Sequence, residues 1–128
     1  MARNISNHYR VTLLFLFFLS FICIAQAQTL NVDLTYYHAT NNSLTADGSK
    51  INIHHLKKDR IKWCAVSRDI WNMFPAKCTN KRIYIEGFGI YHVKDKMHKR
   101  WKRKIDILVH PKNAKKIRKN KVKIKILK

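Results

Sequence analysis

Short segments in which apolar and polar residues alternate are the feature that most constrains the fold of this chain. Residues 30–37 alternate Leu, Val, Leu and Tyr with Asn, Asp and Thr, and residues 122–126 alternate Val, Ile and Ile with Lys. Successive side chains of a β-strand point to opposite faces, so this pattern is typical of a strand with one buried face. Further strands are expected at residues 50–54, 60–66, 81–86, 90–93 and 105–109.

Helices are expected to be few and short. Ser67 is a suitable N-cap for a helix over residues 68–74, which Pro75 would end. Pro111 is well placed to begin a second helix, over residues 111–119. No internal repeat or Gly/Ser-rich linker divides the chain. Six or seven short strands with one or two brief helices predict a mainly β protein, a small barrel whose edges are closed.

The first 27 residues have the pattern of a signal peptide. Arg3 and Arg10 precede an apolar run over residues 11–24, and Ala25-Gln26-Ala27 is a small-x-small cleavage pattern. The run is shorter than the roughly 18 residues that span a bilayer. The sequence therefore predicts a signal peptide at residues 1–27, one domain at residues 28–128, and export to the periplasm or the extracellular space. An uncleaved membrane anchor is the alternative.

The chain is strongly basic, with 27 Lys and Arg against seven Asp and Glu and a net charge of +20. Removing Arg3 and Arg10 with the signal peptide leaves 25 minus 7, or +18. Such a charge attracts polyanions. For an exported chain we expect peptidoglycan or another anionic envelope polymer as partner, no nucleic acid, and membrane contact only through the signal peptide. We expect the protein to be a monomer. The alternative is that the lysines only keep the surface solvated.

Two cysteines, Cys64 and Cys78, remain after the signal peptide. An exported chain with two cysteines is expected to form one disulfide. The closed loop of roughly 15 residues would contribute about 3 kcal/mol in the chain-entropy model. Two buried thiols are the alternative. No zinc or other metal site is expected, because the cysteines form no close pair and the histidines lack a metal-ligand spacing. No cofactor is expected.

Several sequence blocks together resemble a known family. In order they are Thr-Tyr-Tyr at 35–37, Thr-Ala-Asp-Gly-Ser-Lys-Ile at 45–51, Cys-Ala-Val-Ser-Arg-Asp at 64–69, Tyr-His-Val-Lys-Asp at 91–95 and Lys-Ile-Asp-Ile at 104–107. They resemble the 3D (Asp-Asp-Asp) domain, the barrel module shared with membrane-bound lytic transglycosylase A. The resemblance implies a six-stranded double-psi β-barrel and a trio of aspartates, Asp69, Asp95 and Asp106. It implies that Asp106 is the catalytic acid/base and that the other two shape its surroundings.

The resemblance also implies a reaction. A lytic transglycosylase cleaves the glycosidic bond between N-acetylmuramic acid and N-acetylglucosamine with one carboxyl group that acts first as acid and then as base. Next to the motif positions, Thr45, Lys50 and Lys94 are candidate substrate contacts, and Trp101 is a candidate for stacking on a sugar. The alternative is a non-catalytic cationic module that binds cell-wall glycan, which the absence of glycine from residues 96–101 favours.

Asp106 must hold a proton to act as an acid, and its neighbours in the sequence oppose this. Six of the ten residues between Asp95 and Asp106 are Lys or Arg, and nearby cations lower the pKa of a carboxyl group. Burial, or repulsion from Asp95, would raise it. If Ile105 and Ile107 face the core, strand alternation directs Asp106 to the opposite face. A role for both aspartates as salt-bridge partners of nearby lysines is the alternative.

Overall fold

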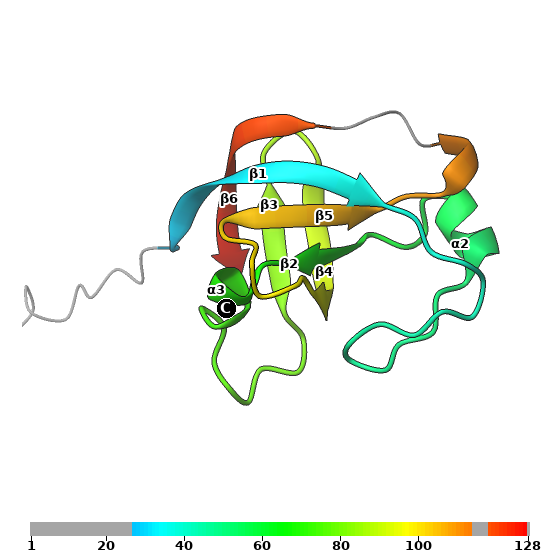
Figure 1. Cartoon of the computed structure of the whole chain (residues 1–128), viewed down its shortest axis with the longest axis horizontal. Coiled ribbons are helices and arrows are strands. Elements are labelled where there is room, and N and C mark those ends of the chain that lie inside the picture. Colours follow the sequence, from blue (N-terminus) through cyan, green and yellow to red (C-terminus); the bar gives the residue numbers. More distant parts are fainter. Residues whose placement is uncertain (1–26, 114–117, 128) are drawn as a thin grey trace, which may run out of the picture.

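A closed six-stranded β-barrel forms the body of the protein (Figure 1). The computed structural model describes residues 27–113 and 118–127. Around the barrel the strand order is β1-β5-β2-β4-β3-β6. The pairs β1–β5 and β2–β4 are parallel, and the other pairs are antiparallel. The strands are β1 (Thr29–Tyr37), β2 (Trp63–Val66), β3 (Arg82–Ile85), β4 (Gly89–Lys96), β5 (Lys104–Leu108) and β6 (Lys119–Leu127).

The core lies inside the barrel and is built by the alternation seen in the sequence. On β5, Ile105 and Ile107 are buried while Lys104 and Asp106 are partly exposed. Removing such side chains from water contributes roughly 1.5–3 kcal/mol each. The expectation of a mainly β barrel with few short helices is therefore confirmed. The core residues are Val32, Leu34, Cys64, Val66, Ile70, Phe74, Ile83, Ile85, Val93, Ile105, Ile107, Ile124 and Ile126.

The strand expected at residues 50–54 is wrong. Lys50 makes only an isolated bridge with Leu44, and helix α2 (Ile53–Lys57) begins within the predicted strand. The side chain of Asn52 accepts a hydrogen bond from the amide of His55 at 3.1 Å and so caps this helix. Alternation over five residues is a weak signal, and the N-cap at Asn52 prevailed over it.

The two predicted helices are shorter than expected. Helix α3 (Arg68–Trp71) ends before Phe74, and Ser67 is its N-cap residue without a capping bond from its side chain. Pro111 begins a single 3-10 turn, η1 (Pro111–Asn113), and Lys119 already belongs to β6. Residues 114–117 lie outside the described part of the chain, as do residues 1–26, which carry most of the predicted signal peptide. None of the helices in the described part is long and apolar enough to cross a membrane.

A second, smaller apolar cluster lies outside the barrel. Ile51, Leu56 and Leu108 are its buried members, and Tyr37 and Trp63 are partly buried against it. The segment between β1 and β2, which includes α2, therefore covers the outer face of β5 near its carboxyl end (Figure 1). This cover determines which outward-facing side chains of the barrel wall are partly buried.

Candidate functional site

A row of side chains crosses four neighbouring strands on the outer face of the barrel. Ala65 on β2 lies opposite Asp106 of β5 and opposite Asp95 of β4. Asp106 in turn lies opposite Thr35 of β1. Residues in register on adjacent strands point to the same face. The fold therefore places Asp95 and Asp106 in one row, on the two strands that flank β2 at Ala65.

Asp106 is half-buried and faces away from the core. Ile105 and Ile107 are 0% and 2% exposed and point inward, so the predicted orientation of Asp106 is confirmed. Its Oδ1 atom is buried and has no hydrogen-bond partner among the described residues. Burial raises the pKa of Asp106 above its usual value, and the ammonium group of Lys104 lowers it by less. A carboxyl group in such surroundings is suited to carry a proton.

Asp95 is tied to the backbone of a nearby turn. Its Oδ1 atom accepts hydrogen bonds from the amide of Ala46 at 3.2 Å and from the amide of Lys96 at 2.9 Å. The amide of Asp47 donates to the carbonyl oxygen of Lys94 at 3.2 Å. These bonds fasten the turn that contains Ala46 and Asp47 to β4, beside the row of outward side chains.

Tyr37 also belongs to this site, although it was not among the residues predicted from the sequence. Its hydroxyl group is buried and has no hydrogen-bond partner among the described residues. Burial raises the pKa of Tyr37, and the nearby charges of Asp95 and Asp106 raise it further. Strand alternation puts residue 37 on the same face as Thr35, and this was the signal available in the sequence.

Two predicted substrate contacts, Thr45 and Lys94, interact with Asp47 of the same chain, through a hydrogen bond and a salt bridge. The hydroxyl group of Thr45, which is 6% exposed, donates to Oδ1 of Asp47 at 2.6 Å. The Nζ atom of Lys94 lies 2.9 Å from Oδ2 of Asp47. Burial alone would raise the pKa of Asp47, but hydrogen bonds from Thr45, Ser49 and Lys94 lower it well below its usual value. Asp47 thus organises the turn that fastens to Asp95.

The other two predicted contacts, Lys50 and Trp101, are exposed. Lys50 follows the Asp47 turn. Trp101 is 36% exposed in the segment between β4 and β5. The Nζ atom of Lys104 lies 3.7 Å from the centre of the indole ring, and the guanidinium carbon of Arg100 lies 4.8 Å from it. Cations therefore already contact the ring that was expected to stack on a sugar.

Asp69 is joined to the start of β5 and not to the pair of aspartates. Its Oδ2 atom accepts a hydrogen bond from the amide of Arg103 at 2.9 Å. Burial alone would raise the pKa of Asp69, but hydrogen bonds from Ser67 and from backbone amides lower it. The hydroxyl group of Ser67 also accepts a bond from the amide of Lys104 at 3.0 Å. Asp69 therefore fixes the chain where it enters the strand that carries Asp106.

The predicted disulfide is absent from the structure, which has Cys64 and Cys78 as free cysteines. Cys64 is fully buried in the barrel, where β2 directs it inward, and burial raises the pKa of its thiol. Cys78 is partly buried against the same core. Both thiols pack as small apolar groups, which corrects the disulfide expectation in favour of its alternative. Among the described residues no group of three or more His, Cys, Asp or Glu side chains is arranged to hold a metal ion.

The structure thus places five of the predicted site residues in three groups. Asp95 and Asp106 share the Ala65 row, Thr45 and Lys94 belong to the Asp47 turn that fastens to Asp95, and Asp69 anchors the start of β5. The hydrogen bond from the amide of Ala46 to Asp95 joins the first two groups. Comparisons with protein-family models, with curated proteins and with solved structures found no match for this chain.

Proposed function

We propose that the protein is a lytic transglycosylase-like enzyme that cleaves the glycosidic bond between N-acetylmuramic acid and N-acetylglucosamine. The observation that carries the proposal is the position of Asp106. It is a half-buried carboxyl group with a raised pKa, and a second carboxylate, Asp95, belongs to the same row, on the far side of β2. General acid catalysis requires a positioned group that holds a proton near the working pH.

Asp106 would act twice on the same sugar. It first donates its proton to the glycosidic oxygen, and the bond between that oxygen and C1 of the muramic acid breaks. The resulting carboxylate then takes the proton from the C6 hydroxyl group, whose oxygen bonds to C1 and closes a 1,6-anhydro ring. Asp106 ends in its starting state, and no water is consumed. One carboxyl group suffices, unlike the pair used by hydrolases.

Asp95 and Tyr37 are the positioning residues in this proposal. Asp95 already accepts two backbone amide bonds, so it fixes the wall beside Asp106 and does not need to carry a proton. The hydroxyl group of Tyr37 is available to donate a hydrogen bond to the Asp106 carboxylate formed after proton transfer, because it has no other partner in the described chain. A double-psi crossing of the barrel strands and export by a signal peptide belong to the same proposal.

The test is the mass of the products released from peptidoglycan. The purified full-length chain is incubated with peptidoglycan, and the soluble fragments are examined for 1,6-anhydro ends. Anhydro products from the wild type and none from Asp106→Asn are expected. Asp59→Asn is a matched control, because Asp59 is an exposed aspartate in the turn after α2. Fragments without anhydro ends would indicate hydrolysis, and unchanged release by Asp106→Asn would refute the assignment.

A non-catalytic glycan-binding module is the second candidate. It is favoured by the internal bonds of the predicted substrate contacts, since Asp47 holds both the Thr45 hydroxyl group and the Lys94 ammonium group. In that case the protein would co-sediment with peptidoglycan and release nothing. Asp106→Asn would then leave co-sedimentation unchanged.

A further inference from the structure

A line of lysines runs along the outer face of β6, which lies two strands from β5 and Asp106 around the barrel. Lys121, Lys123 and Lys125 are exposed, while Ile124 and Ile126 between and beyond them are buried in the barrel. Side chains two residues apart on a strand are separated by about 7 Å. Lys121 has a φ of 57°, and the register between β1 and β6 shifts beside it. Such a bulge re-aims a side chain at the rim of a barrel.

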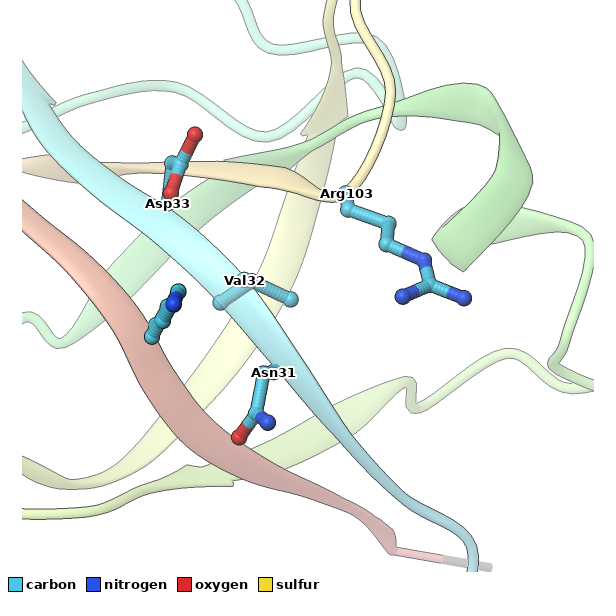
Figure 2. Close-up of a pocket in the computed structure, with 5 residues that line it drawn as sticks. Asn31, Val32, Asp33 and Arg103 are labelled. Atoms are coloured by element: carbon cyan, nitrogen blue, oxygen red, sulfur yellow. The ribbon is translucent and has the colours of Figure 1, made fainter.

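Two open depressions lie next to each other along this line. The first, of about 390 Å³, is the one drawn in Figure 2. The second measures about 440 Å³. They adjoin, because Asn31 of the first lies opposite Lys123 of the second in the β1–β6 register. The first is lined by Asn31, Val32, Asp33, Arg103 and Lys121, and the second by Thr29, Tyr84, Glu86, Lys123 and Lys125.

The cations of this face are not neutralised by ion pairs. Within the described part of the chain, only Lys94 and Asp47 form a salt bridge. In Figure 2 the side chain of Arg103 extends away from the carboxylate of Asp33. Four cations and two carboxylates line the two depressions, which gives a local charge of 4 minus 2, or +2. Lys119 differs from the others, since its ammonium group lies 5.2 Å from the centre of the Phe88 ring.

The remaining lining groups are hydrogen-bonding side chains. Thr29 and Asn31 supply a hydroxyl and an amide group, and Tyr84 supplies an aromatic ring that is 39% exposed. Single-stranded nucleic acid is held by several aromatic rings in succession, and only one lines this face. A membrane-binding face needs a broad apolar surface, and only Ile90 lies beside Tyr84 as a second exposed apolar side chain. The face therefore suits a hydrophilic polyanion.

We infer that this face, the β6 lysine face, binds a linear polymer of small polyols joined by phosphodiesters, such as poly(glycerol phosphate). One repeat of that polymer contains six backbone bonds, twice the number in an amino-acid residue, and spans about 7 Å when extended. This matches the separation of Lys123 and Lys125, which lie beyond the bulge on the regular part of β6. The ammonium groups pair with successive phosphates, and Thr29 and Asn31 donate to the polyol oxygens. The inference does not depend on the proposed enzymatic activity.

Binding of poly(glycerol phosphate) to the purified full-length chain tests the inference, with dextran of similar length as the uncharged probe. The variant carries Lys121→Gln, Lys123→Gln and Lys125→Gln. A matched control carries Lys57→Gln, Lys58→Gln and Lys77→Gln, three exposed lysines outside the β6 lysine face. We expect the β6 variant to lose affinity about tenfold or more in low salt and the control variant to stay close to the wild type. The plot of log affinity against log salt has a negative slope, and its magnitude should decrease by about 2 when three phosphate contacts are lost.

Removing the two carboxylates of this face tests whether affinity for the polymer can be raised. Asp33→Asn and Glu86→Gln together remove the only negative groups that line the depressions, and affinity for poly(glycerol phosphate) is expected to rise severalfold. Equal losses in both lysine variants would mean that net charge alone attracts the polymer, which overturns the inference. Tighter binding to single-stranded DNA or to anionic phospholipid vesicles than to the polymer would also overturn it.

The polymer-binding inference and the enzymatic proposal can be refuted independently of each other. Polymer binding is measured without peptidoglycan, and Asp106→Asn is expected to retain it, because Asp106 does not line either depression. A protein that binds the polymer but releases no anhydro products contradicts only the enzymatic proposal. A protein that releases anhydro products but does not bind the polymer contradicts only the inference about β6.

Discussion

The ammonium group of Lys94 lies 2.9 Å from the carboxylate of Asp47, and this pair joins the turn after β1 to strand β4. The same carboxylate accepts bonds from the Thr45 hydroxyl group at 2.6 Å and from the Ser49 amide at 3.0 Å. Next to the pair, the Ala46 amide donates to Asp95. The strand that carries Asp95 is therefore fastened through Asp47, a residue that the sequence presents only as part of the block at residues 45–51.

Replacing Asp47 by Ala is expected to loosen this turn. The variant loses the acceptor for Thr45, Ser49 and Lys94, and the expected cost is about 1–2 kcal/mol of unfolding free energy. Faster hydrogen exchange at the Ser49 amide is the direct measurement. Lys50→Gln is the control, because Lys50 is exposed in the same segment. Unchanged exchange at Ser49 would contradict the role given to Asp47.

Replacing Asp106 by Asn is expected to stabilise the protein at neutral pH. The pKa of Asp106 is raised in the folded state, so the unfolded chain releases this proton at a lower pH than the folded chain. Stability therefore falls as pH rises from the unfolded pKa, near 3.9, through the raised folded pKa, and the loss persists above it. Asn carries no charge and avoids this loss.

The measurement is the melting temperature of both proteins between pH 3 and pH 8. Asp106→Asn should melt higher than the wild type at pH 7, and the difference should disappear below about pH 4. A lower melting temperature for Asp106→Asn at every pH would indicate that the carboxylate is stabilising and would contradict its burial-raised pKa.

Tyr37→Phe is expected to keep or increase the stability of the protein and to lower its activity. The hydroxyl group is buried without a partner in the described chain, so its removal should leave the unfolding free energy unchanged or raise it by about 1 kcal/mol. If the hydroxyl group donates to Asp106 during the reaction, the rate of anhydro-product release should fall. Equal melting temperature with undiminished release would exclude that role. A destabilised variant would instead reveal a hydrogen bond within the folded protein.

Reducing agents are expected to leave the melting temperature unchanged. Both Cys64 and Cys78 are free, so no covalent loop constrains the unfolded chain. A disulfide between them would add about 3 kcal/mol, which corresponds to roughly 15 °C for a domain of about 100 residues. Peptide masses of the non-reduced protein should contain the two cysteines in separate fragments. A linked fragment would contradict the free-thiol arrangement.

The sequence by itself determined the local features of this protein. Alternation at residues 30–37 and 122–126 identified strands β1 and β6, and the pattern around Asp106 gave its outward orientation, because strand periodicity is a property of neighbouring residues. The same reasoning failed at residues 50–54, where a five-residue alternation competed with the Asn52 N-cap.

The tertiary structure decided which distant residues meet. Asp95 and Asp106 lie in one row on either side of Ala65 because β2 pairs with both β4 and β5, and no local pattern specifies that register. The burial that raises the pKa of Asp106, despite six cations in the preceding ten residues, comes from the closed fold. The free cysteines likewise follow from β2 directing Cys64 into the core, which a count of cysteines could not indicate.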